Sequence, residues 1–241
     1  MQTVPELTHR DHKKGFPMER TPLKYRTLPA YSRGEERFHM ITHIVGGGFA
    51  VVAATLSILL AALHRSPYAV VSASVYGVSL IFLYTMSSIY HGLSPRLMGK
   101  RVFQVMDHCA VFVLIAGTYT PYCLCTLREV SPALGWTYFG VVWGLTALAV
   151  TFNAIDLKKY AVLSNLATLL LGWCIIFRFG VVRSSIGEVG SALLFFGGVA
   201  YTVGCLTYLI GAKRRFFHGI FHLFVLLGSI LQFFSIFFFV L

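Results

Sequence analysis

Seven long runs of apolar residues dominate this chain of 241 residues. A helix advances about 1.5 Å per residue, so about 20 apolar residues cross the ~30 Å hydrocarbon core of a membrane. The runs cover residues 44–63, 68–90, 109–127, 130–155, 160–177, 189–212 and 216–241. Runs this long differ from the alternating ten-residue strands of an outer-membrane barrel. The sequence therefore predicts an all-α integral membrane protein, a bundle of seven transmembrane helices.

The composition supports a multi-pass protein of the cell membrane. Hydrophobic residues make up 56% of the chain and charged residues 12%, whereas a soluble domain usually has about twice that charge. The net charge of +11 raises the possibility of a nucleic-acid partner. The basic residues lie between the apolar runs, however, where they mark membrane topology. We therefore expect no nucleic-acid partner.

The distribution of Lys and Arg predicts the orientation of the bundle. Sixteen lie before the first run or in the second, fourth and sixth connections, and four lie in the other connections. By the positive-inside rule, the amino terminus is cytoplasmic and the carboxyl terminus is outside. Residues 1–38 form a polar, basic tail, which we expect to contact anionic lipid headgroups. Residues 39–241 form the seven-helix transmembrane domain.

Three polar features lie at the ends of these runs, and each has an ordinary structural explanation when taken alone. His218 and His222 are four residues apart, so a helix brings them to one face about 6 Å apart, close enough for one metal ion. A pair of interfacial histidines is the more common case. Ser87 and His91 have the same spacing. Asp107 lies just before the third run, at the start of the predicted helix, where the helix dipole stabilises a carboxylate.

Their predicted depth in the membrane makes the combination informative. The topology brings the end of the second run and the starts of the third and seventh runs to the cytoplasmic leaflet. Three neutral histidines with one open position form a ligand set of catalytic zinc. The sequence thus predicts Zn²⁺ on His91, His218 and His222, with Asp107 as a carboxylate that contacts a ligand or that accepts a proton from the water on the metal.

Two further groups of polar residues could support this site. Glu36, His39 and His43 precede the first run and could supply a fourth ligand, a contact to a ligand, or nothing; we favour a structural or supporting role. Ser229 and Gln232 share the helical arc of His218 and His222, at about 100° per residue. They predict a polar seam for water or a ligand headgroup, or else hydrogen bonds between helices.

Short motifs recur in the same order as in a known family. They are E-E-R-F-H-M-I-T-H at 35–43, S-S-I-Y-H at 87–91, M-D-H at 106–108, A-G-T-Y-T-P at 116–121 and H-G-I-F-H-L-F-V-L-L-G-S at 218–229. Over residues 35–241 the chain resembles the hemolysin III family, the bacterial branch of the progestin and adiponectin receptor superfamily. The resemblance implies zinc on His91, His218 and His222, with Ser87 and Asp107 near its water. Relatives look like intramembrane amide hydrolases of the ceramidase kind.

Two positions depart from the family pattern. The family usually has Asn at the position of His39 and a further His at the position of Gln232. Neither position is among the three proposed ligands, but the first leaves the role of the opening motif open.

Three functions fit these features. The first is a zinc-dependent hydrolase of a lipid amide or ester, with Asp107 and Ser87 as catalytic residues and an acyl chain entering between helices. Asp107 would take the proton, and Ser87 would position the water or the oxyanion. The second is a receptor or membrane-state sensor in which zinc braces three helices. The third is a cytolysin of the hemolysin III type, although the apolar runs lack the charged residues of an aqueous pore.

Overall fold

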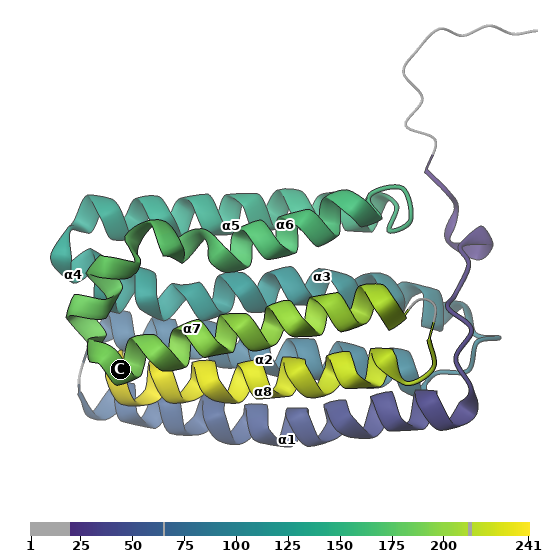
Figure 1. Cartoon of the computed structure of the whole chain (residues 1–241), viewed down its shortest axis with the longest axis horizontal. Helices are drawn as coiled ribbons and strands as arrows, with labels where there is room; N and C mark the ends of the chain where they lie inside the picture. Colours follow the sequence, from purple (N-terminus) through teal and green to yellow (C-terminus); the bar gives the residue numbers. More distant parts are fainter. Residues whose placement is uncertain (1–19, 65, 212–213) are drawn as a thin grey trace, which may run out of the picture.

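The chain forms a bundle of long helices that lie roughly side by side (Figure 1). The computed structural model describes residues 20–64, 66–211 and 214–241, and no β-strand occurs in these ranges. The longer helices are α1 (Arg33–Leu63), α2 (Pro67–Gly92), α3 (Met98–Pro121), α5 (Pro132–Ile155), α6 (Ala161–Trp173), α7 (Phe179–Gly211) and α8 (Phe217–Phe239). Short elements are η1 (Leu23–Tyr25), η2 (Tyr122–Leu127), α4 (Arg128–Val130) and η3 (Cys174–Arg178). The all-α prediction is confirmed over this part of the chain.

Six helical stretches of the described chain are long and apolar enough to cross a membrane. They are Arg33–Leu63, Pro67–Gly92, Met98–Val130, Pro132–Ile155, Ala161–Gly211 and Phe217–Phe239. The stretch Ala161–Gly211 has 51 residues and includes all but the first residue of the predicted span 160–177 and all but the last residue of the predicted span 189–212. Inside α7, Gly187 has a φ of 72° and interrupts the helical backbone, two residues before the second of these spans. Figure 1 shows α6 beside α5 and α7 beside α8.

Polar caps define where α1 begins. Ser32 and Glu35 form a capping box, in which the Glu35 amide donates to the Ser32 hydroxyl at 3.3 Å and the Ser32 amide donates to Glu35 Oε2 at 2.9 Å. α1 therefore starts at Arg33, eleven residues before the first apolar run. Residues 33–38 of the predicted tail are helical, and its residues 1–19 lie outside the described part. This early start carries Glu36, His39 and His43 on the first turns of α1.

Hydrogen bonds between tyrosine and serine join the helices inside the bundle. The hydroxyl of Tyr84 donates to Ser229 Oγ at 2.8 Å, and Tyr201 bonds the same serine at 2.9 Å. The Gln232 amide donates to the carbonyl of Leu194 at 3.1 Å. Such bonds satisfy polar groups that lipid cannot satisfy. Ser229 and Gln232 thus make the hydrogen bonds between helices that were the alternative to a polar seam.

Candidate metal centre

Five histidines from three helices form one buried cluster at an end of the bundle. His39 and His43 come from α1, His91 from α2, and His218 and His222 from α8. Each residue is at most 7% exposed. His43 lies against His222, with ring centroids 3.8 Å apart. Imidazoles gathered away from water need partners for their ring nitrogens, so the cluster could hold a metal ion.

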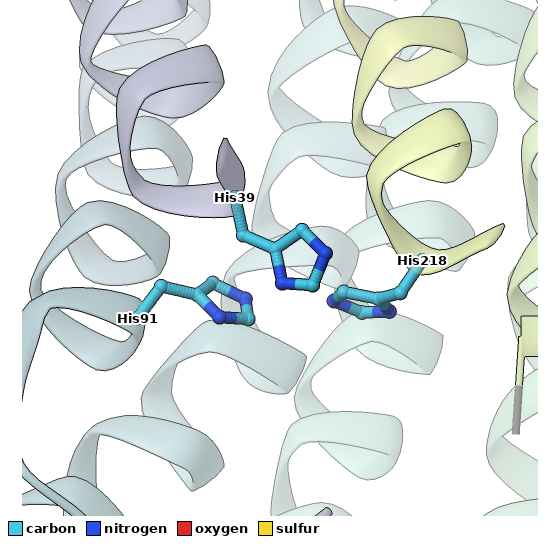
Figure 2. A group of neighbouring side chains, drawn as sticks. All are labelled: His39, His91 and His218. Atoms are coloured by element: carbon cyan, nitrogen blue, oxygen red, sulfur yellow. The ribbon is translucent and has the colours of Figure 1, made fainter. Parts of the chain in front are cut away.

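Three of the five rings present nitrogens to a common space. His39, His91 and His218 each offer one ligand atom, and these atoms all lie within 4.8 Å of one another (Figure 2). Tetrahedral zinc with bonds of about 2.0–2.1 Å holds its ligand nitrogens roughly 3.4 Å apart. Small side-chain rotations would therefore bring the three nitrogens onto one ion. The sequence leaves a fourth-ligand role for His39 open while favouring a supporting one, and the structure brings its ring to the space that His91 and His218 face.

The predicted ligands His91, His218 and His222 are also brought together. Their ring centroids are 4.7–5.3 Å apart, and Nε2 of His218 lies 3.1 Å from Nε2 of His222. His222 Nδ1 lies 3.3 Å from both the Thr42 hydroxyl and the carbonyl oxygen of His39. The predicted set and the observed group therefore share His91 and His218. They differ in whether His222 or His39 completes the set.

Several ring nitrogens of the cluster have no hydrogen-bond partner among the described residues. They are both nitrogens of His39, both nitrogens of His43 and Nε2 of His91. A buried polar atom without a partner is costly, and native proteins usually satisfy it with protein, water or an ion. Neutral imidazole nitrogens are common ligands of zinc. The donor set therefore fits a metal ion chemically.

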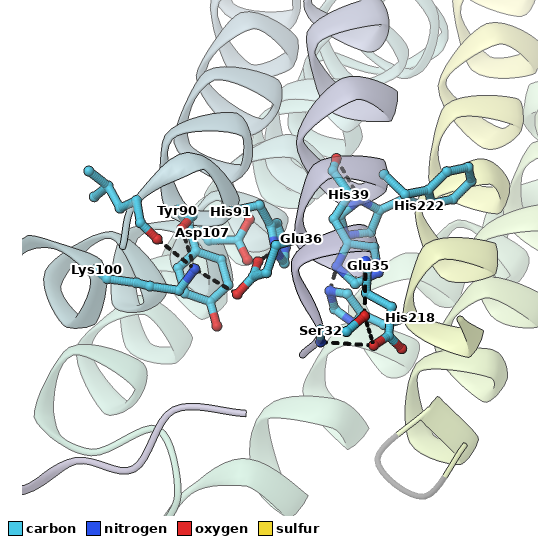
Figure 3. Close-up of polar contacts among 12 residues, drawn as sticks. Ser32, Glu35, Glu36, His39, Tyr90, His91, Lys100, Asp107, His218 and His222 are labelled. Atoms are coloured by element: carbon cyan, nitrogen blue, oxygen red, sulfur yellow. Dashed lines mark hydrogen bonds and ion pairs between the residues drawn. The ribbon is translucent and has the colours of Figure 1, made fainter. Parts of the chain in front are cut away.

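A carboxylate fixes the orientation of His91. Glu36 Oε2 lies 2.7 Å from His91 Nδ1, which must donate because an ionised carboxylate only accepts (Figure 3). This contact leaves Nε2 of His91 directed to the cluster. Lys100 donates to Glu36 Oε1 at 2.7 Å and to the carbonyls of Tyr90 at 3.1 Å and Leu93 at 3.0 Å. The pattern matches the carboxylate–histidine pairs that orient metal ligands.

In the sequence, Lys100 counts only as one of the basic residues that indicate the orientation of the bundle. In the structure its side chain is only 1% exposed. Its partner Glu36 is 64 residues away, so no local pattern could identify the ion pair. His39 had a usable signal, because it stands four residues before His43. That spacing is the same as in the pair His218 and His222 and places both rings on one face of α1.

The segments that flank α1 and α8 cover and position the cluster. The ring of Tyr31 stacks on His218 with centroids 5.1 Å apart and meets His39 edge-on at 5.0 Å. Burial raises the pKa of the Tyr31 phenol, which therefore stays protonated. The amide of Phe216 donates to Glu35 Oε1 at 3.0 Å and ties the start of α8 to the start of α1. This tie fixes the position of His218 relative to His39.

A cavity of about 160 Å³ adjoins the cluster and continues between the helices. Ser87, Asp107, His218 and His222 all line it, together with mainly apolar side chains of α3, α6, α7 and α8. The Ser87 hydroxyl is buried and has no partner among the described residues. The Asp107 side chain is 15% exposed, and its Oδ2 lies 3.8 Å from Nδ1 of His108. The predicted catalytic residues thus border one space with two predicted ligands; their catalytic roles stay predictions.

Comparisons with known proteins agree with the sequence motifs. The Haemolysin-III related family matches residues 31–233. Hemolysin-3 of Bacillus cereus is 37% identical over 208 residues, which cover 86% of this chain and 92% of that protein. A Hemolysin-3 homolog of Bacillus subtilis is 36% identical over 205 residues, covering 85% and 94%. The human Monocyte to macrophage differentiation factor is 27% identical over 194 residues, covering 78% and 79%. The chain belongs to the Haemolysin-III related family.

Proposed function

We propose that this protein is a zinc-dependent hydrolase that cleaves an amide or ester bond of a membrane lipid. The observation that carries the proposal is the buried histidine cluster, with His91, His218 and His222 brought together beside a largely apolar cavity. Ser87 and Asp107 border that cavity. A metal-ligand set next to a space for an acyl chain is the arrangement such a reaction needs.

We propose that α6 and α7 cross the membrane separately, which gives seven spans. The two apolar runs in Ala161–Gly211, interrupted near Gly187, support this reading. The excess of Lys and Arg in alternate connections supports a cytoplasmic amino terminus and an external carboxyl terminus. The histidine cluster then lies in the inner leaflet, where a lipid can enter sideways between helices.

In this proposal His91, His218 and His222 would hold the ion, next to the cavity that His218 and His222 line. A bound Zn²⁺ supplies Lewis-acid chemistry, which polarises a carbonyl and acidifies a water molecule. Glu36 holds His91 in the tautomer whose Nε2 is free. Asp107 accepts the proton of the attacking water, and the Ser87 hydroxyl donates to the developing oxyanion.

The apolar wall of the cavity binds the acyl chain and excludes bulk water from the carbonyl. Water adds to this carbonyl, the C–N or C–O bond breaks, and the amine or alcohol leaves with the proton that Asp107 accepted. The products are a fatty acid and the remainder of the lipid. Lipid turnover by the purified protein tests this scheme, with an N-acyl sphingoid lipid and a diacyl ester as the substrates.

The decisive variant is Asp107→Asn, which keeps the size of the side chain and removes the base. We expect it to keep its zinc and to lose about 100-fold or more in fatty-acid release. His91→Ala should lose both zinc and turnover. Full turnover by Asp107→Asn, or no turnover by a wild-type protein loaded with zinc, would remove the hydrolase mechanism.

One observation favours a second candidate, a receptor or membrane-state sensor in which the ion is structural. The imidazole of His39 faces the same space as those of His91 and His218, and both of its nitrogens lack partners among the described residues. Four imidazoles around zinc would close its coordination shell, as in structural sites. The ion would then brace α1, α2 and α8 without breaking a bond.

The variant His39→Asn separates the two candidates. If His39 is a ligand, the substitution weakens zinc binding; if the fourth position is open to substrate, zinc affinity stays unchanged. His39→Leu is the matched control for the Asn amide: Leu has no ligand atom, so a difference between the two variants would come from the amide. Lysis, which the name of the Bacillus relatives suggests, is tested in the same preparations by dye leakage from vesicles.

A further inference from the structure

A second cavity lies on the opposite side of α6 from most of the histidine-lined space. This α5–α6 groove has a volume of about 290 Å³. Its lining residues are Val141, Leu145, Leu148, Ala149, Phe152, Asn153, Leu163, Ser164, Ala167, Leu170, Leu171 and Cys174. It shares only Ser164 with the cavity at the histidine cluster. The groove therefore needs an explanation separate from the proposed catalytic site.

The groove is open to the membrane along its rim. Ala149 and Leu171 at its floor are 8% and 4% exposed, whereas Leu148 and Leu170 at its rim are 56% and 73% exposed. In a bilayer, apolar surface of this kind contacts lipid chains. The volume is much larger than the roughly 30 Å³ that a water molecule takes in the liquid, and the walls are almost wholly apolar. An acyl chain fits these walls better than water does.

One polar side chain interrupts the apolar lining. Asn153 is 1% exposed, and neither its amide nitrogen nor its amide oxygen has a hydrogen-bond partner among the described residues. An unsatisfied amide at membrane depth is costly. The group can donate two hydrogen bonds and accept others, which suits the ester carbonyls and hydroxyls of a glycerolipid. This unpaired amide indicates a ligand with a polar group at that point.

The position of Asn153 along α5 matches the depth of a lipid ester. It lies two residues before the end of α5 at Ile155, and the groove extends from there to Val141. The twelve helical steps from Val141 to Asn153 span about 18 Å at about 1.5 Å per residue. Half of the ~30 Å hydrocarbon core is about 15 Å, so the groove has the length of a chain in one leaflet. The amide then stands at the level where chain and headgroup meet.

Basic residues follow at once beyond the groove. Lys158 and Lys159 are exposed in the turn between α5 and α6. The backbone N–H groups of both lysines donate to Asp156 Oδ1, at 3.1 and 3.2 Å, which fixes the turn. Lysine pairs beside a span attract anionic headgroups. Along α5 the groove thus presents apolar walls, then a polar amide, then two ammonium groups. This order matches the acyl chain, the ester and the phosphate of a glycerophospholipid.

We propose that the α5–α6 groove is a binding site for one anionic glycerophospholipid. Its acyl chain lies between α5 and α6, its ester region hydrogen-bonds the Asn153 amide, and its phosphate pairs with Lys158 and Lys159. The site is independent of the histidine cluster, so a lipid bound there is not the substrate of the proposed reaction.

The test is a titration of delipidated, full-length protein with phosphatidylglycerol or phosphatidylcholine, followed by native mass spectrometry. We expect one phosphatidylglycerol to bind, and phosphatidylcholine to bind at least about tenfold more weakly, because it lacks the net negative charge. Asn153→Leu should weaken phosphatidylglycerol binding about tenfold through the lost hydrogen bonds. Leu145→Trp, which fills the rim, should abolish it. Leu56→Trp on the exposed face of α1 is the matched control and should bind as the wild type does.

Unchanged binding in both Asn153→Leu and Leu145→Trp would overturn the proposal, as would equal affinity for the two lipids. Dimers that disappear with Leu145→Trp would also overturn it, because a second copy would then fill the groove. Thermal melting of each variant checks that it folds. If Asn153→Leu does not fold, Leu145→Trp and the comparison of the two lipids still decide the matter.

Discussion

The buried ion pair of Glu36 and Lys100 allows stability and metal binding to be separated by mutation. Its side chains are 14% and 1% exposed, and the ammonium also donates to two backbone carbonyls. Lys100→Met leaves the Glu36 carboxylate buried with His91 as its remaining partner. Breaking one side of a buried pair costs about 3–5 kcal/mol. We therefore expect the free energy of unfolding of Lys100→Met to fall by about that amount.

The double variant Glu36→Met with Lys100→Met removes both charges and fills the space with apolar atoms. Replacing a buried pair in this way is often neutral for stability, so most of the lost free energy of unfolding should return. His91 then has no carboxylate to fix its tautomer and ring orientation. Loss of such a partner typically reduces metal affinity about 10-fold to 100-fold. The double variant should thus be nearly as stable as the wild type but bind zinc more weakly.

Two measurements check this pair of expectations. Unfolding in detergent is followed by circular dichroism, and zinc affinity by competition with a chromophoric chelator. Arg183→Gln is the matched control, since its ion pair with Glu188 is exposed (56% and 75%) and should contribute little. Wild-type stability of Lys100→Met would show that the buried pair is not formed. Wild-type zinc affinity of the double variant would refute the role given to Glu36.

Three other perturbations follow from the structure. If an ion joins α1, α2 and α8, removing it with a chelator lowers the melting temperature and adding zinc restores it; an unchanged melting temperature would contradict bridging. Burial raises the pKa of Asp156, but hydrogen bonds from Thr21 and the following turn outweigh it and lower the pKa from 3.8 to about 2. The ionised form of Asp156 thus stabilises the fold above pH 3.8, and this contribution is lost as the pH falls to about 2. The melting temperature should therefore depend less on pH in this range for Asp156→Asn than for the wild type. At Gly46 a Cβ would lie 2.3 Å from Tyr84 Cε1, so Gly46→Ala should lower the free energy of unfolding by about 1–3 kcal/mol. A Cβ at Gly48 meets no described atom within 4 Å, so Gly48→Ala should not lower the free energy of unfolding.

The helical architecture was predictable because a membrane leaves so few options. Backbone groups in lipid must pair within their own segment, so a long apolar run implies a helix. The start of α1 was not visible in hydropathy, since residues 33–43 are largely polar. The signal was the capping box of Ser32 and Glu35, which sets the helix start independently of apolar content.

The sequence could predict that the site residues share one end of the bundle, but not the directions of their side chains. Position along a span indicates which end of the bundle a residue occupies, so the end of α2 and the starts of α3 and α8 could be aligned from the sequence. Which residues face one another depends on the rotation of each helix about its axis. Lys100 illustrates the difficulty, because a lysine in a basic connection is ordinary until Glu36 is found opposite it.

α1 contributes no residue to the predicted ligand set, yet it supplies much of the site. It carries Glu36, which orients His91, and His39, whose ring nitrogens face the shared space. It is joined to α8 by the bond from the Phe216 amide to Glu35. Neither this link nor the hydrogen bond between Glu36 and His91 of α2 needs a metal, so all three helices are held together before an ion binds and their ligands are preorganised. An ion would then add to existing contacts, and hydrogen exchange on metal removal should increase only locally, at the ends of the helices that carry the ligands.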